Sequence, residues 1–200
     1  METLLKSGYD KIMKLFYENK NESMHLREIV RRTKMNENSA KRFLDKLEKE
    51  KILISEKDGN MRKFSIRKND KVFQIFSYLD IEKLNSLDML RKAAIDYFLD
   101  KLEEKPIIAF IFGSTAKGTA KKDSDIDILL IVNKKIKTEE ASRYVGAQTG
   151  IRMSIFQIDY NNFKLELKTK EDKVIASAIS TGFPATNHIQ YYREVLKEWK

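Results

Sequence analysis

The chain has 200 residues, of which 42% are apolar and 10% aromatic, and it carries a formal net charge of +9. These values predict one or two folded domains with a sizeable core, and they exclude disordered and collagen-like chains. The apolar runs are too short to cross a bilayer, cysteine is absent, and the first residues do not resemble a signal peptide, so we expect a cytoplasmic protein without a membrane partner.

The first part of the sequence has the apolar spacing of three short helices. Apolar residues recur at helical intervals in the segments 3–17, 26–33 and 40–47. Ser23 and Asn36 precede the second and third segments, and side chains of this kind favour the N-cap position. We therefore expect two capped helices to follow the first one.

A β-hairpin is expected after these helices. Apolar and polar residues alternate on both sides of Asp58-Gly59, and glycine readily adopts the positive φ of a tight turn. Three helices followed by a hairpin are typical of a winged helix-turn-helix domain, which we expect over residues 1–84.

The positive charge is concentrated in this part of the chain. Residues 20–71 hold 16 Lys and Arg against 9 Asp and Glu, whereas residues 86–200 hold 19 against 16. In a helix-turn-helix the second helix of the motif enters the major groove, where Asn and Arg bond base edges. We therefore expect duplex DNA as a partner, although a protein-binding module or a solvated basic face is a competing interpretation. The expected nucleic-acid contacts are outward residues of the third helix and basic residues of the hairpin: Asn38, Lys41, Arg42, Lys57, Arg62 and Lys63. Arg27, Arg31 and Arg32 could add to the same strip.

The remainder of the chain predicts a linking helical segment followed by an α/β domain. Helical spacing over 71–104 breaks at Asn85-Ser86, with Ser86 as the expected N-cap of the second part. Strand-like runs then alternate with helical segments, which is typical of α/β folds. These runs are 106–112, 126–132 and 151–158. Two helices separated by a turn at 181–184 end the chain, and we expect their aromatic residues to be core or dimer contacts, so a homodimer stays open. The second domain is expected over residues 86–200.

A glycine-serine turn ends the first of these strands. At Gly113-Ser114 a glycine lets the backbone approach a phosphate, and the serine hydroxyl and free N–H groups can bind it. Lys117 adds a positive charge nearby. This turn predicts a phosphate-binding loop.

Two aspartates stand at the start of the next strand. Asp125 and Asp127 are two residues apart, so a period of two places both carboxylates on one face. Neighbouring carboxylates repel unless a proton or a cation relieves them, and Mg²⁺ prefers oxygen ligands. With Ser124 orienting the pair, these residues predict a Mg²⁺ or Mn²⁺ site for phosphoryl or nucleotidyl transfer.

The combined pattern Gly113-Ser114, Gly118 and Ser124-Asp125-Ile126-Asp127 resembles the minimal nucleotidyltransferases of the DNA polymerase beta superfamily. The resemblance is strict over residues 106–132 and looser from there to the C-terminus. It implies an α/β domain with a mixed sheet flanked by helices, in which Asp125 and Asp127 are catalytic metal ligands. It also implies transfer of an NMP from an NTP to a hydroxyl acceptor. The nucleotide contacts implied are Gly113, Ser114, Lys117 and Ser124.

One part of the family pattern is missing. Active members usually take a third acidic residue from a later strand, and the corresponding position here is Ser154, which cannot act as a base at neutral pH. Asp159 has the opposite parity on that strand and would need a bulge to reach the site. Glu139, Glu140 or a partner chain are the remaining sources.

Two functions of different classes follow. The first is a nucleotidyltransferase whose winged helix binds nucleic acid. The second is a DNA-binding transcriptional regulator whose nucleotidyltransferase-like domain is a degenerate nucleotide sensor or dimerisation module. The intact Asp125-Asp127 pair favours the first, and Ser154 favours the second. An adaptor that binds a protein through the wing has less support from the charge pattern.

Overall fold

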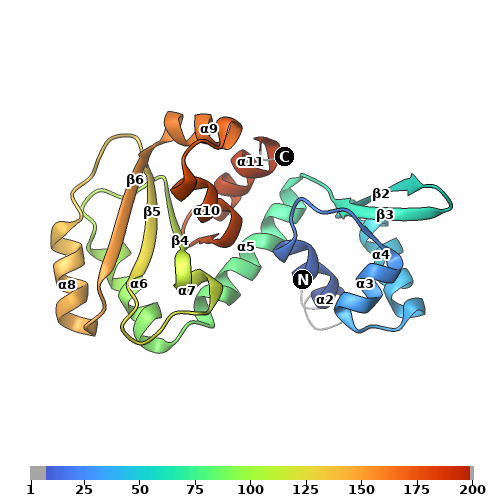
Figure 1. The fold of residues 1–200 in the computed structure, drawn as a ribbon, viewed down its shortest axis with the longest axis horizontal. Helices are drawn as coiled ribbons and strands as arrows, with labels where there is room; N and C mark the ends of the chain where they lie inside the picture. Colours follow the sequence, from blue (N-terminus) through green and yellow to red (C-terminus); the bar gives the residue numbers. More distant parts are fainter. Residues whose placement is uncertain (1–7, 199–200) are drawn as a thin grey trace. The chain divides into compact units, whose positions relative to one another are not determined.

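The structure is a computed structural model that describes residues 8–198. The residues up to Leu79 form one compact unit and those from Asp80 onward form a second (Figure 1). The segment 3–7 of the first expected helix lies outside the described residues. In the described part of the chain, no helix is both long and apolar enough to cross a membrane.

The first unit combines helices with a three-stranded antiparallel sheet of order β1-β3-β2. Its elements are α2 (Gly8–Glu18), β1 (Met24–His25), α3 (Leu26–Thr33), α4 (Glu37–Lys49), β2 (Leu53–Asp58), β3 (Met61–Ile66) and the first part of α5 (Asp70–Asn85). Buried apolar side chains of α2, α3 and α4 contribute to its core, among them Ile12, Phe16, Ile29, Ala40 and Leu44. The three helices and the hairpin were therefore predicted correctly as elements.

Of the caps and the turn predicted for this unit, some are confirmed and one is wrong. Asn36 caps α4, since its side chain accepts a hydrogen bond from the N–H of Ser39 at 2.8 Å. The hairpin closes through Gly59, which has a φ of +61°. The N-cap predicted at Ser23 is wrong, because Met24–His25 pairs with β3 and α3 begins only after His25.

The second unit contains a mixed four-stranded sheet of order β6-β5-β4-β7. β5 and β6 are parallel, whereas β4 pairs antiparallel with β5 and with β7. The elements are α6 (Met89–Lys101), β4 (Ile108–Phe112), α7 (Gly113–Lys117), β5 (Ile126–Val132), α8 (Glu139–Thr149), β6 (Met153–Asp159), α9 (Tyr160–Thr169), α10 (Lys173–Thr181), β7 (Phe183–Pro184) and α11 (His188–Glu198). The expected α/β architecture with a mixed sheet is confirmed.

Helices cover both faces of this sheet, and the two faces differ in what they bury (Figure 1). Alternate residues of β5, Ile126, Ile128 and Leu130, join the main core with residues of α6 and α8. The opposite parity carries Asp127 and Leu129, and α9, α10 and α11 pack on that side of the unit. The alternation therefore separates the carboxylate face from the main core.

Two local predictions in this unit are wrong. The N-cap of α6 is Asp88, whose carboxylate accepts from the N–H of Arg91 at 2.9 Å, whereas the Ser86 hydroxyl donates back to the carbonyl of Lys83. Within the expected turn 181–184, Phe183–Pro184 forms β7, because these residues pair with β4.

Candidate functional site

The glycine-serine turn lies where β4 ends and α7 begins. Gly113 is the first residue of α7 and has a φ of +67°, a conformation that side chains other than glycine rarely adopt. The carbonyl of Ser114 accepts a hydrogen bond from the N–H of Thr119 at 3.0 Å, which ties the turn to the following loop. Gly118 ends α7 with a φ of +68°. Lys117 is exposed at the last position of α7.

Asp127 lies against this turn. It pairs with Phe112 across β4 and β5, and a Cβ placed on Gly113 would overlap its carboxylate oxygen Oδ2. Partial burial, and next the charge of Asp125, raise the pKa of Asp127 above its ordinary value. The two aspartates are therefore close enough to repel each other, as the sequence pattern indicates.

Ser154 occupies the strand position beside this carboxylate. In the parallel register of β5 and β6, Asp127 pairs with Ser154 and Leu129 pairs with Phe156. Paired residues of neighbouring strands point to the same face, so the Ser154 hydroxyl shares the face of Asp127. Phe156 on the same face is 40% exposed, and its ring lies 5.6 Å from the ring of Phe112.

Asp159 lies at the other end of the strand pair. It pairs with Val132, five positions along β5 from Asp127. Its carboxylate caps α9 by accepting from the N–H groups of Asn161 and Asn162 at 2.9 and 3.3 Å. The bulge that would turn Asp159 toward the site is therefore absent from this register.

Glu139 and Glu140 begin α8, which follows the carboxyl end of β5 rather than the end that carries Asp127. The Glu139 carboxylate accepts from the N–H of Thr138 at 3.1 Å, and backbone hydrogen bonds lower its pKa. Among residues 8–198, no group of three or more histidine and carboxylate side chains is placed to hold a metal ion. No third carboxylate joins the aspartate pair in the described part of the chain.

Arg152 pairs with Asp125, a contact that the sequence analysis missed. Its Nε donates to Oδ1 of Asp125 at 3.0 Å. The residue stands two positions before Ser154, so strand parity alone could have placed it on the same face. The site therefore contains two carboxylates, one hydroxyl and one guanidinium.

Arg91 of α6 donates hydrogen bonds to the segments on both sides of the site. The sequence analysis did not identify this residue. Its guanidinium donates to Oγ1 of Thr115 at 3.2 Å and to the carbonyls of Lys121 and Ser124 at 2.5 and 3.0 Å. The residue is only 6% exposed, and Asp88 pairs with it at 3.3 Å. It therefore joins α7 to the loop that precedes the two aspartates.

Ser124 acts on the loop in the observed geometry. Its hydroxyl accepts from the N–H of Lys121 at 2.9 Å, and its own N–H donates to the Lys121 carbonyl at 3.0 Å. These two bonds close the loop 121–124 immediately before Asp125. A contact between Ser124 and a nucleotide stays a prediction.

The donor set fits a small divalent cation. Asp127 and Ser154 are paired across β5 and β6, and Asp125 directly precedes β5. Hard oxygen donors of this kind suit Mg²⁺ and Mn²⁺. The raised pKa of Asp127 supports the same conclusion, because a bound cation would relieve the repulsion that contributes to it.

The residues expected to contact nucleic acid lie on α4 and on the hairpin. Asn38, Lys41 and Arg42 are exposed on α4, as expected, and Lys57 is exposed on β2. Lys63 is half-buried and pairs in the sheet with His25. Lys41 and Arg62 line a groove of about 320 Å³ that also includes Arg27 and Met61.

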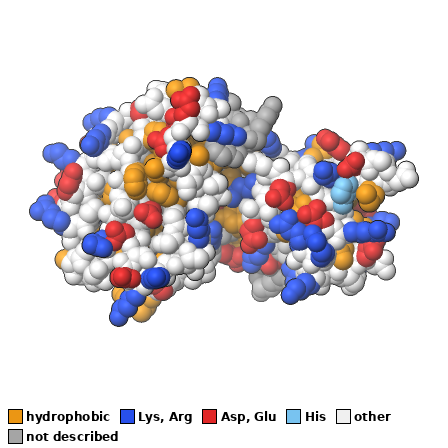
Figure 2. Space-filling view, in the orientation of Figure 1, with side chains coloured by type: hydrophobic (Ala, Val, Ile, Leu, Met, Phe, Trp, Pro, Cys, Tyr) orange, Lys and Arg blue, Asp and Glu red, His pale blue; other side chains and the backbone are white. Residues whose placement is uncertain are grey.

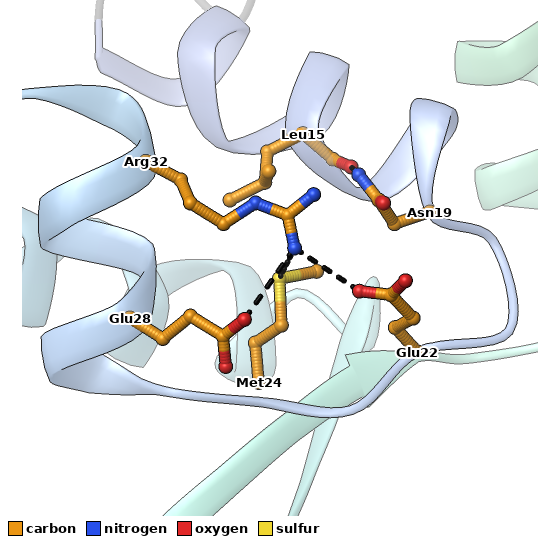
Figure 3. A network of polar contacts seen from close by, with 6 residues as sticks. All are labelled: Leu15, Asn19, Glu22, Met24, Glu28 and Arg32. Atoms are coloured by element: carbon orange, nitrogen blue, oxygen red, sulfur yellow. Dashed lines mark hydrogen bonds and ion pairs between the residues drawn. The ribbon is translucent and has the colours of Figure 1, made fainter.

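Several of the cationic side chains already have acidic partners. Arg62 pairs with Asp45 at 2.9 Å and also with Glu48. Arg32 donates to Glu22 and Glu28 at 3.0 and 3.4 Å (Figure 3). Blue and red side chains are interleaved over this unit in Figure 2. The positive charges of this unit are therefore interspersed with carboxylates, and several of the cations are paired with them.

Residues 94–182 match the family model described as polymerase beta, nucleotidyltransferase. Among solved structures, one match is entitled "Structure of TrmBL2, an archaeal chromatin protein, shows a novel mode of DNA binding", with 16% identity and a TM-score of 0.24. That match covers 83% of this chain and 73% of the other. No curated protein matches the chain. The matched residues 94–182 contain the glycine-serine turn and both aspartates, so this part of the chain is similar to the polymerase beta nucleotidyltransferases.

Proposed function

We propose that the protein transfers an NMP from a Mg²⁺-bound NTP to a hydroxyl acceptor. The observation that carries this proposal is the contact of Asp127 with the turn at Gly113, together with the nearby charge of Asp125, which contributes to the raised pKa of Asp127. The family match over residues 94–182 supports the same reaction class.

Each part of the site has a role in this reaction. Asp125 and Asp127 would hold the metal, and Ser114 and Lys117 would bind the phosphates. A divalent cation held by these carboxylates would supply electrostatic stabilisation of the charge that develops on the phosphates during transfer. Arg91 would hold α7 and the loop before the aspartates in position relative to each other through its three hydrogen bonds.

The proposed reaction does not require a residue of the described chain to act as a general base. The acceptor oxygen forms a bond to the α-phosphorus, the bond from that phosphorus to the bridging oxygen breaks, and pyrophosphate leaves. The acceptor proton passes to solvent water, since a serine occupies the position beside Asp127. We therefore expect slow transfer compared with a site that has three carboxylates.

We also propose that the first unit is a winged helix-turn-helix that binds duplex DNA. Its helices and three-stranded sheet, with the hairpin at the end, support this assignment. The exposed cations Lys41 and Arg42 on α4 supply contacts suited to phosphates and base edges.

A DNA-binding regulator is the second candidate. Ser154 beside Asp127 favours it, because a nucleotide can bind at such a site without efficient chemistry. The nucleotidyltransferase domain would then sense a nucleotide or form a dimer.

The test uses NTPs labelled at the α-phosphate, Mg²⁺ or Mn²⁺, and tRNA, DNA ends or protein as acceptors. Asp125→Asn and Asp127→Asn should each abolish label transfer. Asp123→Asn is the matched control, since Asp123 is exposed in the same loop. Transfer that persists in both site variants would refute the assigned site. Absence of transfer by the unaltered protein, together with salt-dependent duplex binding, would establish the regulator.

A further inference from the structure

Arg152 forms an ion pair with Asp125, one of the two carboxylates that the proposed metal site needs. Its Nε lies 3.0 Å from Oδ1 of Asp125, so this oxygen faces a guanidinium in the structure. The side chain of Arg152 is 80% exposed and that of Asp125 is 40% exposed. An ion pair this exposed is weak and exchanges readily with solvent and ions.

The surroundings of this pair favour exchange. Asp125 and Asp127 bring two negative charges to the face, and Arg152 brings one positive charge. A divalent cation neutralises both carboxylates at once, whereas the guanidinium bonds only Asp125. A metal ion would therefore displace Arg152 from Asp125.

A displaced Arg152 would be left beside the site without its carboxylate. Its position before β6, at the parity of Ser154, keeps it on the face where the nucleotide is expected. Guanidinium groups bind phosphate oxygens through two parallel hydrogen bonds, which suits them to a polyphosphate.

We infer that Arg152 is an exchangeable counter-ion, which pairs with Asp125 in the metal-free protein and moves to the phosphates of the nucleotide when a divalent cation takes Asp125. This inference rests on the proposed function, and it adds a coupling between the metal and nucleotide sites. Because coupling between two ligands is reciprocal, metal would raise nucleotide affinity partly through Arg152, and nucleotide would raise metal affinity in the same way.

The test compares the unaltered protein with Arg152→Gln and with a control, Arg143→Gln. Arg143 is an exposed arginine on α8, which packs against α6 on the opposite side of the sheet. Mn²⁺ binding is measured by electron paramagnetic resonance, first with the ion alone and then with adenosine α,β-methylene triphosphate. Neither measurement requires turnover.

Without nucleotide, Arg152→Gln should bind Mn²⁺ about two- to fivefold more tightly than the unaltered protein, the range expected for loss of an exposed competing ion pair. With the nucleotide analogue this advantage should vanish or reverse, because the phosphate contact is lost. Arg143→Gln should match the unaltered protein in both states.

Equal Mn²⁺ affinity of all three proteins without nucleotide would overturn the inference while leaving the metal site intact. A tighter variant that keeps its full advantage with the analogue would refute the phosphate contact, and with it the exchange. Absence of Mn²⁺ binding by the unaltered protein would instead refute the proposed metal site and this inference together. Asp127→Asn gives the reference signal for a disabled site.

Discussion

Gly113 and Asp127 are in such close contact that a side chain on the glycine would overlap the carboxylate. The contact arises because β4 ends directly opposite the first acidic position of β5, where Phe112 pairs with Asp127. The turn at Gly113 and the Asp127 carboxylate therefore pack directly against each other, so a substitution at either position affects the other.

Gly113→Ala should consequently lower the stability of the protein by more than backbone strain alone would. A non-glycine residue with positive φ costs about 1–2 kcal/mol of stability. Gly150→Ala is the matched control, since Gly150 has a φ of +70° but no atom near an added Cβ. Urea denaturation should show a larger loss for Gly113→Ala, and Mn²⁺ binding should weaken only in that variant. Equal losses and unchanged binding would contradict the contact.

The raised pKa of Asp127 predicts a pH-dependent stability. Burial and the nearby Asp125 raise this pKa above the ordinary value of 3.8, so the unfolded chain loses the proton at lower pH than the folded protein. The metal-free protein should therefore lose stability as the pH rises from 3.8 through the raised pKa. Asp127→Asn cannot ionise and should lack this loss.

Urea denaturation of both proteins in a metal chelator, at a series of pH values, measures the difference. The stability of the unaltered protein relative to Asp127→Asn should fall over that interval and then stay constant. At neutral pH, added Mg²⁺ should stabilise only the unaltered protein, because the ionised carboxylate binds it. Parallel pH curves for the two proteins would refute the assignment.

Ser154→Asp should complete the carboxylate set. Its side chain would share the face of Asp127, with which Ser154 pairs across β5 and β6. We expect Mn²⁺ to bind at least about tenfold more tightly, which corresponds to about 1.4 kcal/mol. The metal-free variant should be less stable at neutral pH because a third negative charge joins the face. Ser154→Asn, which adds similar bulk without charge, should show neither change. Calorimetry and urea denaturation measure the two effects.

The expected DNA interface predicts different outcomes for two cationic residues. Arg42 is exposed on α4, whereas Arg62 is held by Asp45 and Glu48. Arg42→Ala should weaken duplex binding and reduce the salt slope by about one. Arg62→Ala should instead lower stability and leave the salt slope nearly unchanged. Fluorescence anisotropy at several salt concentrations distinguishes them, and a salt slope that responds only to Arg62 would reverse the assignment.

Periodic features were predictable from the sequence because alternation and helical spacing are local properties. The limits of β5 belong to this class. The cap at Asn36 was also predictable, because it depends only on the residue type directly before the helix. The cap expected at Ser86 failed because Asp88 supplies a carboxylate two residues later. β7 was missed because two extended residues become a strand only by pairing with β4.

The two aspartates and the turn were found because their spacing is specific, but their supports were not. Arg91 contacts residues 24 to 33 positions away, and no local pattern reports such contacts. Ser154 was identified through the family resemblance, and strand parity could have placed Arg152 on the same face. Long-range polar contacts therefore account for most of what the sequence analysis missed at the site.

Arg91→Lys should show how far the site depends on those contacts. Lysine keeps the charge, but its single amino group cannot reach Thr115 and both loop carbonyls in the way the guanidinium does. We expect a loss of about 1–3 kcal/mol in the free energy of unfolding, because buried partners lose hydrogen bonds. Mn²⁺ affinity should fall as well, since the aspartate loop would no longer be fixed to α7. Lys92→Ala removes only the neighbouring ion pair with Asp96 and should change stability by less than about 0.5 kcal/mol. A destabilised Arg91→Lys with unchanged Mn²⁺ affinity would limit Arg91 to a role in folding.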